Sequence, residues 1–263
     1  MVPTEGSVQV NGIVPYNDRT LNAKQIGVVF GQRSQLWWDI PVSETLYMMK
    51  YMYRIPDDIF KHNMDIFTDI LDIGSFQHVA VRQLSLGQRM RADLCAALLH
   101  NPQVVFLDEP TIGLDIVAKK KIREFLLEIN QVYKTTIMLT THDMSDIEKL
   151  CSRVIVINDG QKVYDGLLDG LKRNYGSGEL MKVQTEVPWE RDYQDLYAIG
   201  VNKVEYVDET KFNIQYNKET ISSTNLLTYI MNKARIIDFE VRPSEIEEVI
   251  REIYDRAAKH EHA

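Results

Sequence analysis

Four apolar residues followed by two adjacent acids are the feature that most constrains the fold of this chain. Val104–Leu107 is a continuous apolar run of the kind that forms a strand buried on both faces, and Asp108, Glu109 and Pro110 end it. The acids are therefore expected at the carboxyl end of a strand, where open α/β sheets bind their ligands. Because neighbouring side chains point in different directions there, one acid can serve a metal while the other faces a water. Taken alone, the pattern also fits an ordinary strand end with two solvated acids.

Apolar runs alternate with amphipathic helical patterns over the first two thirds of the chain. The runs predict strands at 26–30, 104–107, 136–141 and 154–157. Apolar side chains spaced by three and four residues predict helices within 42–99 and at 116–132 and 144–151. Two shorter runs, 7–10 and 13–16, flank Asn11-Gly12, a dipeptide that favours a hairpin. This order predicts an α/β fold with a mostly parallel sheet.

A second unit is expected to begin near Gly176. Its patterns predict a strand at 180–187, a helix at 193–199, a hairpin at 201–216, a helix at 226–234, a strand at 236–241 and a charged helix at 244–256. These elements fit a small α+β module in which no motif carries chemistry. The sequence therefore predicts two domains, 1–175 and 176–263.

The segment Leu84-Ser85-Leu86-Gly87-Gln88 stands upstream of the acids, directly before a predicted helix. A serine and a glycine at a helix start can direct a hydroxyl and several free amides at an anion. The same residues also fit a plain N-cap on a core helix.

Two further segments follow the acids. Gly113-Leu114-Asp115 forms a predicted turn into the next helix, and His142 stands at the end of the next apolar strand. A single histidine is more often structural than functional. Its place at the end of a strand that is expected beside the acidic one favours a functional role.

These segments together resemble the motifs of ABC-type ATPases, in the order and spacing of that family. The matching segments are the Q-loop (Phe30-Gly31-Gln32), the signature sequence (84–88), the Walker B strand (105–110), the D-loop (113–115) and the switch histidine (His142). Leu86 stands where the signature usually has glycine. The resemblance covers residues 7 to about 170 and implies a P-loop NTPase-like parallel sheet, incomplete at the N-terminus, with a helical subdomain at about 42–100.

The resemblance implies a role for each residue near the acids in binding and hydrolysing ATP with Mg²⁺. Asp108 would support Mg²⁺, and Glu109 would polarise the attacking water as general base. His142 would stabilise the γ-phosphate and the water. Gln32 would contact the γ-phosphate and the metal and couple the site to a membrane partner.

Other residues would act across a dimer of such subunits. Ser85, Gly87 and Gln88 would close over the ATP held by the opposite subunit, and Asp115 would form contacts between the subunits. The family implies a second ATPase subunit, expected as a homodimer, and a separate integral-membrane permease. The segment from Gly31 to Asp39, with the leucine in the signature, further resembles ATPases of multidrug or viologen-type exporters.

One family element has no counterpart in the sequence. The phosphate-binding loop G-x-x-x-x-G-K-[S/T] wraps backbone amides and a lysine around the phosphates, and no Gly-Lys dipeptide occurs here. In the family this loop precedes a Pro-Thr-x-Gly segment, which is Pro3-Thr4-Glu5-Gly6 in this chain. We therefore expect a chain truncated before or at that loop, with apolar strand faces left uncovered.

The net charge and the lengths of the apolar runs indicate which partners and which location to expect. The net charge of −8 argues against binding to nucleic acid. No run of 18 apolar residues occurs, and the first six residues lack the basic and apolar stretches of a signal peptide. We expect a cytoplasmic protein, peripheral on the inner face of the cell membrane. Two alternatives are a non-hydrolysing partner that donates only the signature and a soluble ABC ATPase outside transport.

Overall fold

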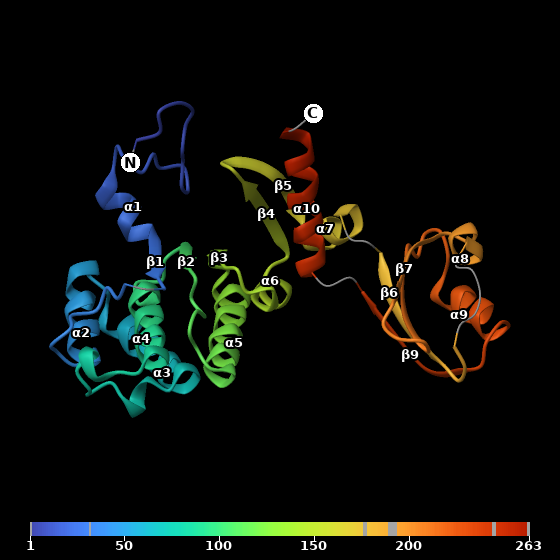
Figure 1. Ribbon diagram of the computed structural model, residues 1–263. Helices are drawn as coiled ribbons and strands as arrows, with labels where there is room; N and C mark the ends of the chain where they lie inside the picture. Colours follow the sequence, from blue (N-terminus) through green and yellow to red (C-terminus); the bar gives the residue numbers. More distant parts are fainter. Residues whose placement is uncertain (1, 32, 176–177, 189–193, 244–245, 262–263) are drawn as a thin grey trace. The chain divides into compact units, whose positions relative to one another are not determined.

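Figure 1 shows the computed structural model of the chain, which describes residues 2–31, 33–175, 178–188, 194–243 and 246–261. The chain divides into two compact units, Met1–Leu150 and Cys151–Ala263. The division lies before the expected boundary at residue 175, because α7 (Leu168–Tyr175) packs against α10 (Ile246–Glu261) within the second unit. The assignment of residues 1–175 to one ATPase domain stays a prediction.

Three parallel strands form the sheet of the first unit, in the order β1 (Ile26–Phe30), β2 (Val104–Asp108) and β3 (Thr136–Thr140). Phe30 is paired with Asp108, and Asp108 with Thr140, so the three strands end at one edge. The predicted α/β fold with a parallel sheet is therefore confirmed. The register brings the residues that follow each strand to the same edge.

The helices of the first unit are α1 (Arg19–Gln25), α2 (Val42–Tyr53), α3 (Asp57–Leu71), α4 (Leu86–Leu98), α5 (Ile116–Tyr133) and α6 (Met144–Leu150). The helical region expected within 42–99 is divided into α2, α3 and α4. Arg54 and Asp72 take left-handed conformations, with φ of 55° and 54°, and so end α2 and α3.

One face of the three-stranded sheet carries the core of this unit. Val29, Val105 and Leu107 are buried and pack with apolar side chains of the surrounding helices. On the other face, Phe30 and Met138 are 53% and 51% exposed. The expectation of strands buried on both faces is therefore wrong for the described chain, because the helices pack against one face and leave the other partly open.

Of the hairpin expected near the N-terminus, the structure contains the turn at Asn11 and Gly12 but not the two flanking strands. Residues 7–10 and 13–16 form no paired strands, and an isolated bridge joins Val10 to Ile13 around the turn at Asn11 and Gly12. Two short segments bury too little surface to form a stable hairpin without a third strand or a covering helix. Val8, in the first of these segments, is 46% exposed.

A buried acid fastens the loop after β1 to α4. Asp93 Oδ1 accepts hydrogen bonds from Ser34 Oγ at 2.9 Å and from the backbone N–H of Gln35 at 3.0 Å. Asp93 is 4% exposed. This burial raises the pKa of its carboxyl to about 6, although the two hydrogen bonds act to lower it. The segment that leaves the sheet edge is thus tied to the helix that carries the signature sequence.

The second unit contains a hairpin and a separate antiparallel sheet. β4 (Arg153–Asn158) and β5 (Gln161–Leu167) form the hairpin, so the strand expected at 154–157 pairs antiparallel with its neighbour instead of extending a parallel sheet. The sheet has the order β7 (Val201–Tyr206), β8 (Lys211–Tyr216), β6 (Glu179–Thr185) and β9 (Ile236–Pro243).

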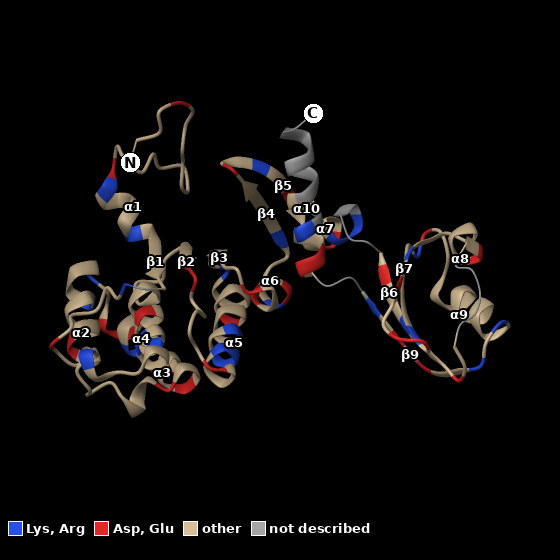
Figure 2. Ribbon diagram, in the orientation of Figure 1, with Lys and Arg blue, Asp and Glu red and all other residues tan. Residues whose placement is uncertain are grey.

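The sheet of the second unit packs with α8 (Gln194–Ala198) and α9 (Ser223–Met231) around its own apolar core, which includes Met181, Phe212, Ile214, Leu226 and Ile230. This is the expected α+β module. Figure 2 shows basic and acidic residues interspersed along α5 of the first unit and along the strands of the second unit. Within the described ranges, no helix is both long and apolar enough to cross a bilayer.

The close packing of α4 on β1 predicts that Gly27→Ala destabilises the first unit. A Cβ at position 27 would overlap the carbonyl oxygen of Ala97, which is backbone and cannot turn away. We expect a loss of about 1–3 kcal/mol in the free energy of unfolding, measured by urea denaturation. Gly74→Ala is the control, because its Cβ would meet the movable methyl of Thr68 at 3.0 Å. Equal midpoints for the two variants would contradict the packing.

The burial of Asp93 predicts a pH-dependent stability. The pKa of its carboxyl is raised from 3.8 to about 6 in the folded chain, so the folded state binds the proton more tightly than the unfolded state. This contribution is fully present below pH 3.8 and is lost as the pH rises through 6. We expect Asp93→Asn to reduce the change with pH in the free energy of unfolding by up to about 3 kcal/mol, measured by denaturation at several pH values.

The exposed Asp69→Asn on α3 serves as the matched control, and it should leave the pH dependence unchanged. If Asp93→Asn shows the same pH profile as the parent chain, the carboxyl is not buried in the way described.

Candidate functional site

The carboxyl edge of the three-stranded sheet holds both predicted acids. The backbone N–H of Gly31 donates to the carbonyl oxygen of Asp108 at 2.7 Å, and the N–H of Glu109 donates to that of Thr140 at 3.0 Å. A cavity of about 380 Å³ opens at this edge, and Phe30, Gly31, Arg33, Asp108 and Glu109 line it. The edge therefore offers two carboxylates and an open space beside them, as the sequence predicted.

Backbone geometry at this edge depends on Gly31. A Cβ there would lie 2.7 Å from the carbonyl oxygen of Glu109 and 2.8 Å from that of Asp108, too close for any side chain. Glu109 itself has φ of 52°, in the left-handed region that non-glycine residues enter at a cost. Strain of this kind is commonly stored at functional sites, where the surrounding structure imposes it.

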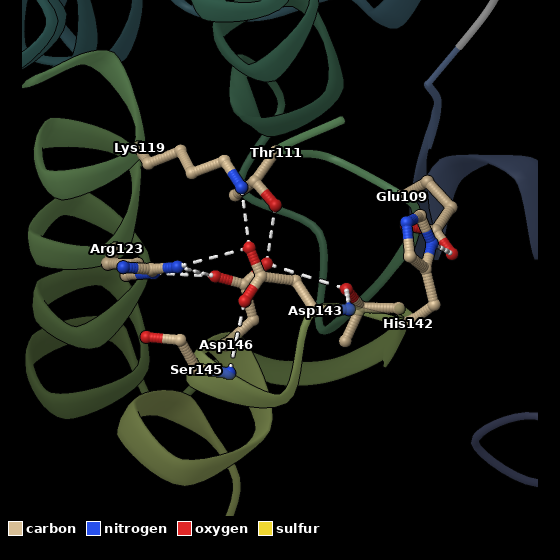
Figure 3. Close-up of polar contacts among 9 residues, drawn as sticks. Glu109, Thr111, Lys119, Arg123, His142, Asp143, Ser145 and Asp146 are labelled. Atoms are coloured by element: carbon tan, nitrogen blue, oxygen red, sulfur yellow. Dashed lines mark hydrogen bonds and ion pairs between the residues drawn. The ribbon is translucent and has the colours of Figure 1, made fainter. Parts of the chain in front are cut away.

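Glu109 and His142 form a contact from neighbouring strand ends. His142 Nδ1 lies 2.8 Å from Glu109 Oε1, and Figure 3 shows the imidazole against the carboxylate. Because an ionised carboxylate only accepts hydrogen bonds, Nδ1 must carry the proton, which leaves Nε2 available to a ligand. The side chain of His142 is 73% exposed and that of Glu109 is 27% exposed. The pair predicted from separate segments is therefore brought together and is accessible.

Asp108 is oriented by the next strand. Thr140 Oγ1 donates to Asp108 Oδ1 at 2.5 Å, and among the described residues this is the hydrogen bond that the carboxylate accepts. The second oxygen stays available. Mg²⁺ is commonly held by one or two carboxylates together with phosphates and waters, so this carboxylate fits such an ion. Among the described residues, no three His, Cys, Asp or Glu side chains are grouped so that they could hold a metal ion. The other predicted metal contact, Gln32, lies outside the described residues.

Ser85 and Gln88 form a capping box at the start of α4. Ser85 Oγ accepts from the N–H of Gln88 at 3.2 Å, and Gln88 Oε1 accepts from the N–H of Ser85 at 2.9 Å. The structure thus shows the N-cap that the sequence offered as an alternative. Their predicted contact with ATP on an opposite subunit stays a prediction.

The signature and the D-loop lie side by side in the first unit. A Cβ on Gly113, whose φ is 69°, would lie 2.9 Å from Leu86 Cδ2, and one on Gly87 would lie 3.9 Å from Leu114 Cδ2. Asp115 caps α5, because its Oδ1 accepts from the N–H of Ala118 at 2.9 Å. The two segments predicted to face a second subunit therefore share one surface, at the starts of α4 and α5.

Sequence reasoning missed several residues that hold this edge in place. Thr140 orients Asp108, and a cluster behind His142 joins α5 to α6; its members are Thr111, Lys119, Arg123, Asp143 and Asp146. A signal was present, since Lys119 and Arg123 are spaced by four residues and so share a helix face. The sequence alone does not identify the acids with which Lys119 and Arg123 pair.

Comparisons with known proteins show what the chain is similar to. The ABC transporter family matches residues 1–112. An uncharacterized ABC transporter ATP-binding protein of Methanocaldococcus jannaschii is 27% identical over 222 residues, which are 82% of this chain and 76% of that protein. The methionine import ATP-binding protein MetN 2 of Enterococcus faecalis is 32% identical over 168 residues, which are 62% of this chain and 48% of that protein.

A solved structure resembles the chain as well. It is a dimeric ATP-binding cassette in a post-hydrolysis state, bound to ADP and Pi, with 25% identity and a TM-score of 0.56 over 64% of this chain and 75% of that one. Since one of the relatives is an import protein, what the relatives share is ATP binding and not a direction of transport. In its parallel sheet and in the sequence of residues 1–112, the chain is therefore similar to the ATP-binding proteins of ABC transporters.

Proposed function

We propose that this chain is the ATP-hydrolysing subunit of an ABC transporter, and that it drives export through a separate permease on the inner face of the cell membrane. The observation that carries the proposal is the contact between Glu109 and His142 at the carboxyl edge of a parallel sheet. Export rests on the resemblance of residues 31–39 and of Leu86 to exporter ATPases.

Glu109 is placed to act as general base. Its second carboxylate oxygen, outside the bond to His142, accepts the proton of a water as that water attacks the γ-phosphorus of ATP. His142 holds the carboxylate through Nδ1–H, and when the imidazole is protonated at both nitrogens its Nε2–H can donate to the γ-phosphate. Asp108 would hold Mg²⁺ through the oxygen that Thr140 leaves open, and a bound Mg²⁺ supplies charge stabilisation to the phosphates. Gln32 would complete the contacts to phosphate and metal.

A second ATPase subunit completes the proposed site. The starts of α4 and α5 form one surface, and this surface carries Ser85, Gly87, Gln88 and Asp115. The related cassette bound to ADP and Pi is a dimer, which supports a homodimer here. In that arrangement the signature of each subunit would close over ATP held by the other.

A second candidate function is a half-site role. The signature segment is fully formed, with the capping box at the start of α4 exposed to solvent. It can therefore be offered to ATP held by another, complete subunit even if this chain holds none. Nucleotide binding by the purified chain separates the two functions.

The proposed base predicts that Glu109→Gln abolishes turnover and leaves binding intact. We expect release of phosphate from MgATP to fall by about 100-fold or more, because the amide cannot accept the proton of the attacking water. Binding of a fluorescent ATP analogue should be unchanged. Glu124→Gln is the control, since Glu124 is an exposed residue of α5 whose ion pair among the described residues is with Lys120 at 3.8 Å.

The measurement is made with the purified chain alone and with the chain mixed with a complete ABC ATP-binding subunit. Turnover by the chain alone supports the first function. Stimulation of the complete subunit without binding by the chain supports the half-site role. If neither binding nor stimulation is found, both are wrong.

A further inference from the structure

Two basic residues on one face of α5 form ion pairs with acids in the segment that carries His142. Lys119 Nζ lies 2.5 Å from Asp143 Oδ2, and Arg123 lies 2.5 Å from Asp146 Oδ1 through both its Nε and a terminal nitrogen. Figure 3 shows both side chains reaching from the helix to the two acids. Arg123 also lies 3.6 Å from Asp143 Oδ2, so the four residues form one connected ion cluster.

This ion cluster is mostly buried. The side chain of Asp146 is fully buried, that of Arg123 is 13% exposed, and those of Asp143 and Lys119 are 24% and 26% exposed. The neighbouring ammonium group of Lys119 lowers the pKa of the Asp143 carboxyl, so this acid is ionised at neutral pH. Buried ion pairs add little net stability, but removing one partner leaves an uncompensated charge. The geometry of such a cluster is therefore held firmly.

The ion cluster is bonded to the loops that carry Glu109 and His142. Asp143 directly follows His142, and its N–H donates to Thr141 Oγ1 at 3.0 Å. Thr111, two residues after Glu109, donates its hydroxyl hydrogen to Asp146 Oδ2. Thr141 Oγ1 also lies 3.5 Å from Asp146 Oδ2, so the loop after β2 and the loop after β3 both contact the same buried acid, which pairs with Arg123 of α5.

We propose that Lys119 is a positioning residue, which holds Asp143 so that the adjacent His142 keeps its Nδ1–H directed at Glu109. The inference rests on the proposed function, because that function gives the Glu109–His142 contact its use. Arg123 and Asp146 anchor the same segment and are more deeply buried. Lys119 is therefore the member whose removal moves the loop without leaving the fully buried Asp146 unpaired.

The same helix reaches the surface predicted to face a second subunit. Asp115 caps α5, and the backbone N–H of Lys119 donates to the carbonyl oxygen of Asp115 at 2.9 Å. One helical turn therefore separates the D-loop from the lysine that holds the histidine loop. α5 connects these two parts of the site as a rigid element.

The test is the tautomer of His142, observed by ¹⁵N NMR of the full chain at a pH above the ordinary titration range of histidine. The hydrogen bond to Glu109 requires the Nδ1–H tautomer, whereas a free imidazole prefers Nε2–H. Signals of His142 are identified by their loss in His142→Gln. We expect Nδ1–H to predominate in the parent chain and its population to fall by about twofold or more in Lys119→Met.

Lys120→Met is the matched control, because Lys120 is the next residue of α5 but has a side chain that is 75% exposed and, within the described ranges, pairs with Glu124 alone. It should leave the tautomer unchanged. Lys119→Arg should restore the Nδ1–H form, since it returns a cation to Asp143. Asp143→Asn removes the same ion pair from the other side, and it replaces Lys119→Met should that variant fail to fold.

An unchanged tautomer in Lys119→Met or in Asp143→Asn overturns the proposal, as does a parent chain in which Nδ1–H does not predominate. These readouts need no nucleotide. A chain that shows the expected tautomers but neither binds nor hydrolyses ATP would therefore refute the proposed function while leaving the positioning role of Lys119 in place.

Discussion

The parallel pairing of β1, β2 and β3 is the constraint on which the rest of the site depends. Its register sets Phe30, Asp108 and Thr140 side by side, so the residues after each strand meet at one edge. Gly31 lets the chain turn there against two carbonyl oxygens, and Glu109 leaves β2 in a left-handed conformation. A slip of one residue in the pairing of β2 with β3 would separate Glu109 from His142, because successive residues point to opposite faces.

Around this edge the polar side chains hold loops that the sheet alone leaves unsupported. Asp93 ties the loop after β1 to α4, while the ion cluster of α5 and α6 ties the loops after β2 and β3 to α5. α4 and α5 begin side by side with the signature and the D-loop. The two helices that carry the predicted contacts to a second subunit are therefore the same two that hold the loops at this edge.

The sequence predicted the parallel strands, the acids at a strand end and the histidine beside them, because apolar runs and strand ends are local patterns. It predicted two strands near the N-terminus that the structure does not contain. Pairing within residues 7–16 requires a third strand or a covering helix, and no local sequence pattern indicates whether one is present. It missed Thr140, Lys119 and Asp146 for a related reason. Their importance comes from partners more than twenty residues away, and spacing alone does not name those partners.

The most direct test of the account is a nuclear Overhauser measurement between the imidazole protons of His142 and the side-chain methylene protons of Glu109 in the intact chain. The parallel register and the 2.8 Å distance from His142 Nδ1 to Glu109 Oε1 predict a cross-peak between these protons. A spectrum in which the imidazole protons show cross-peaks to other residues and none to Glu109 would contradict the site.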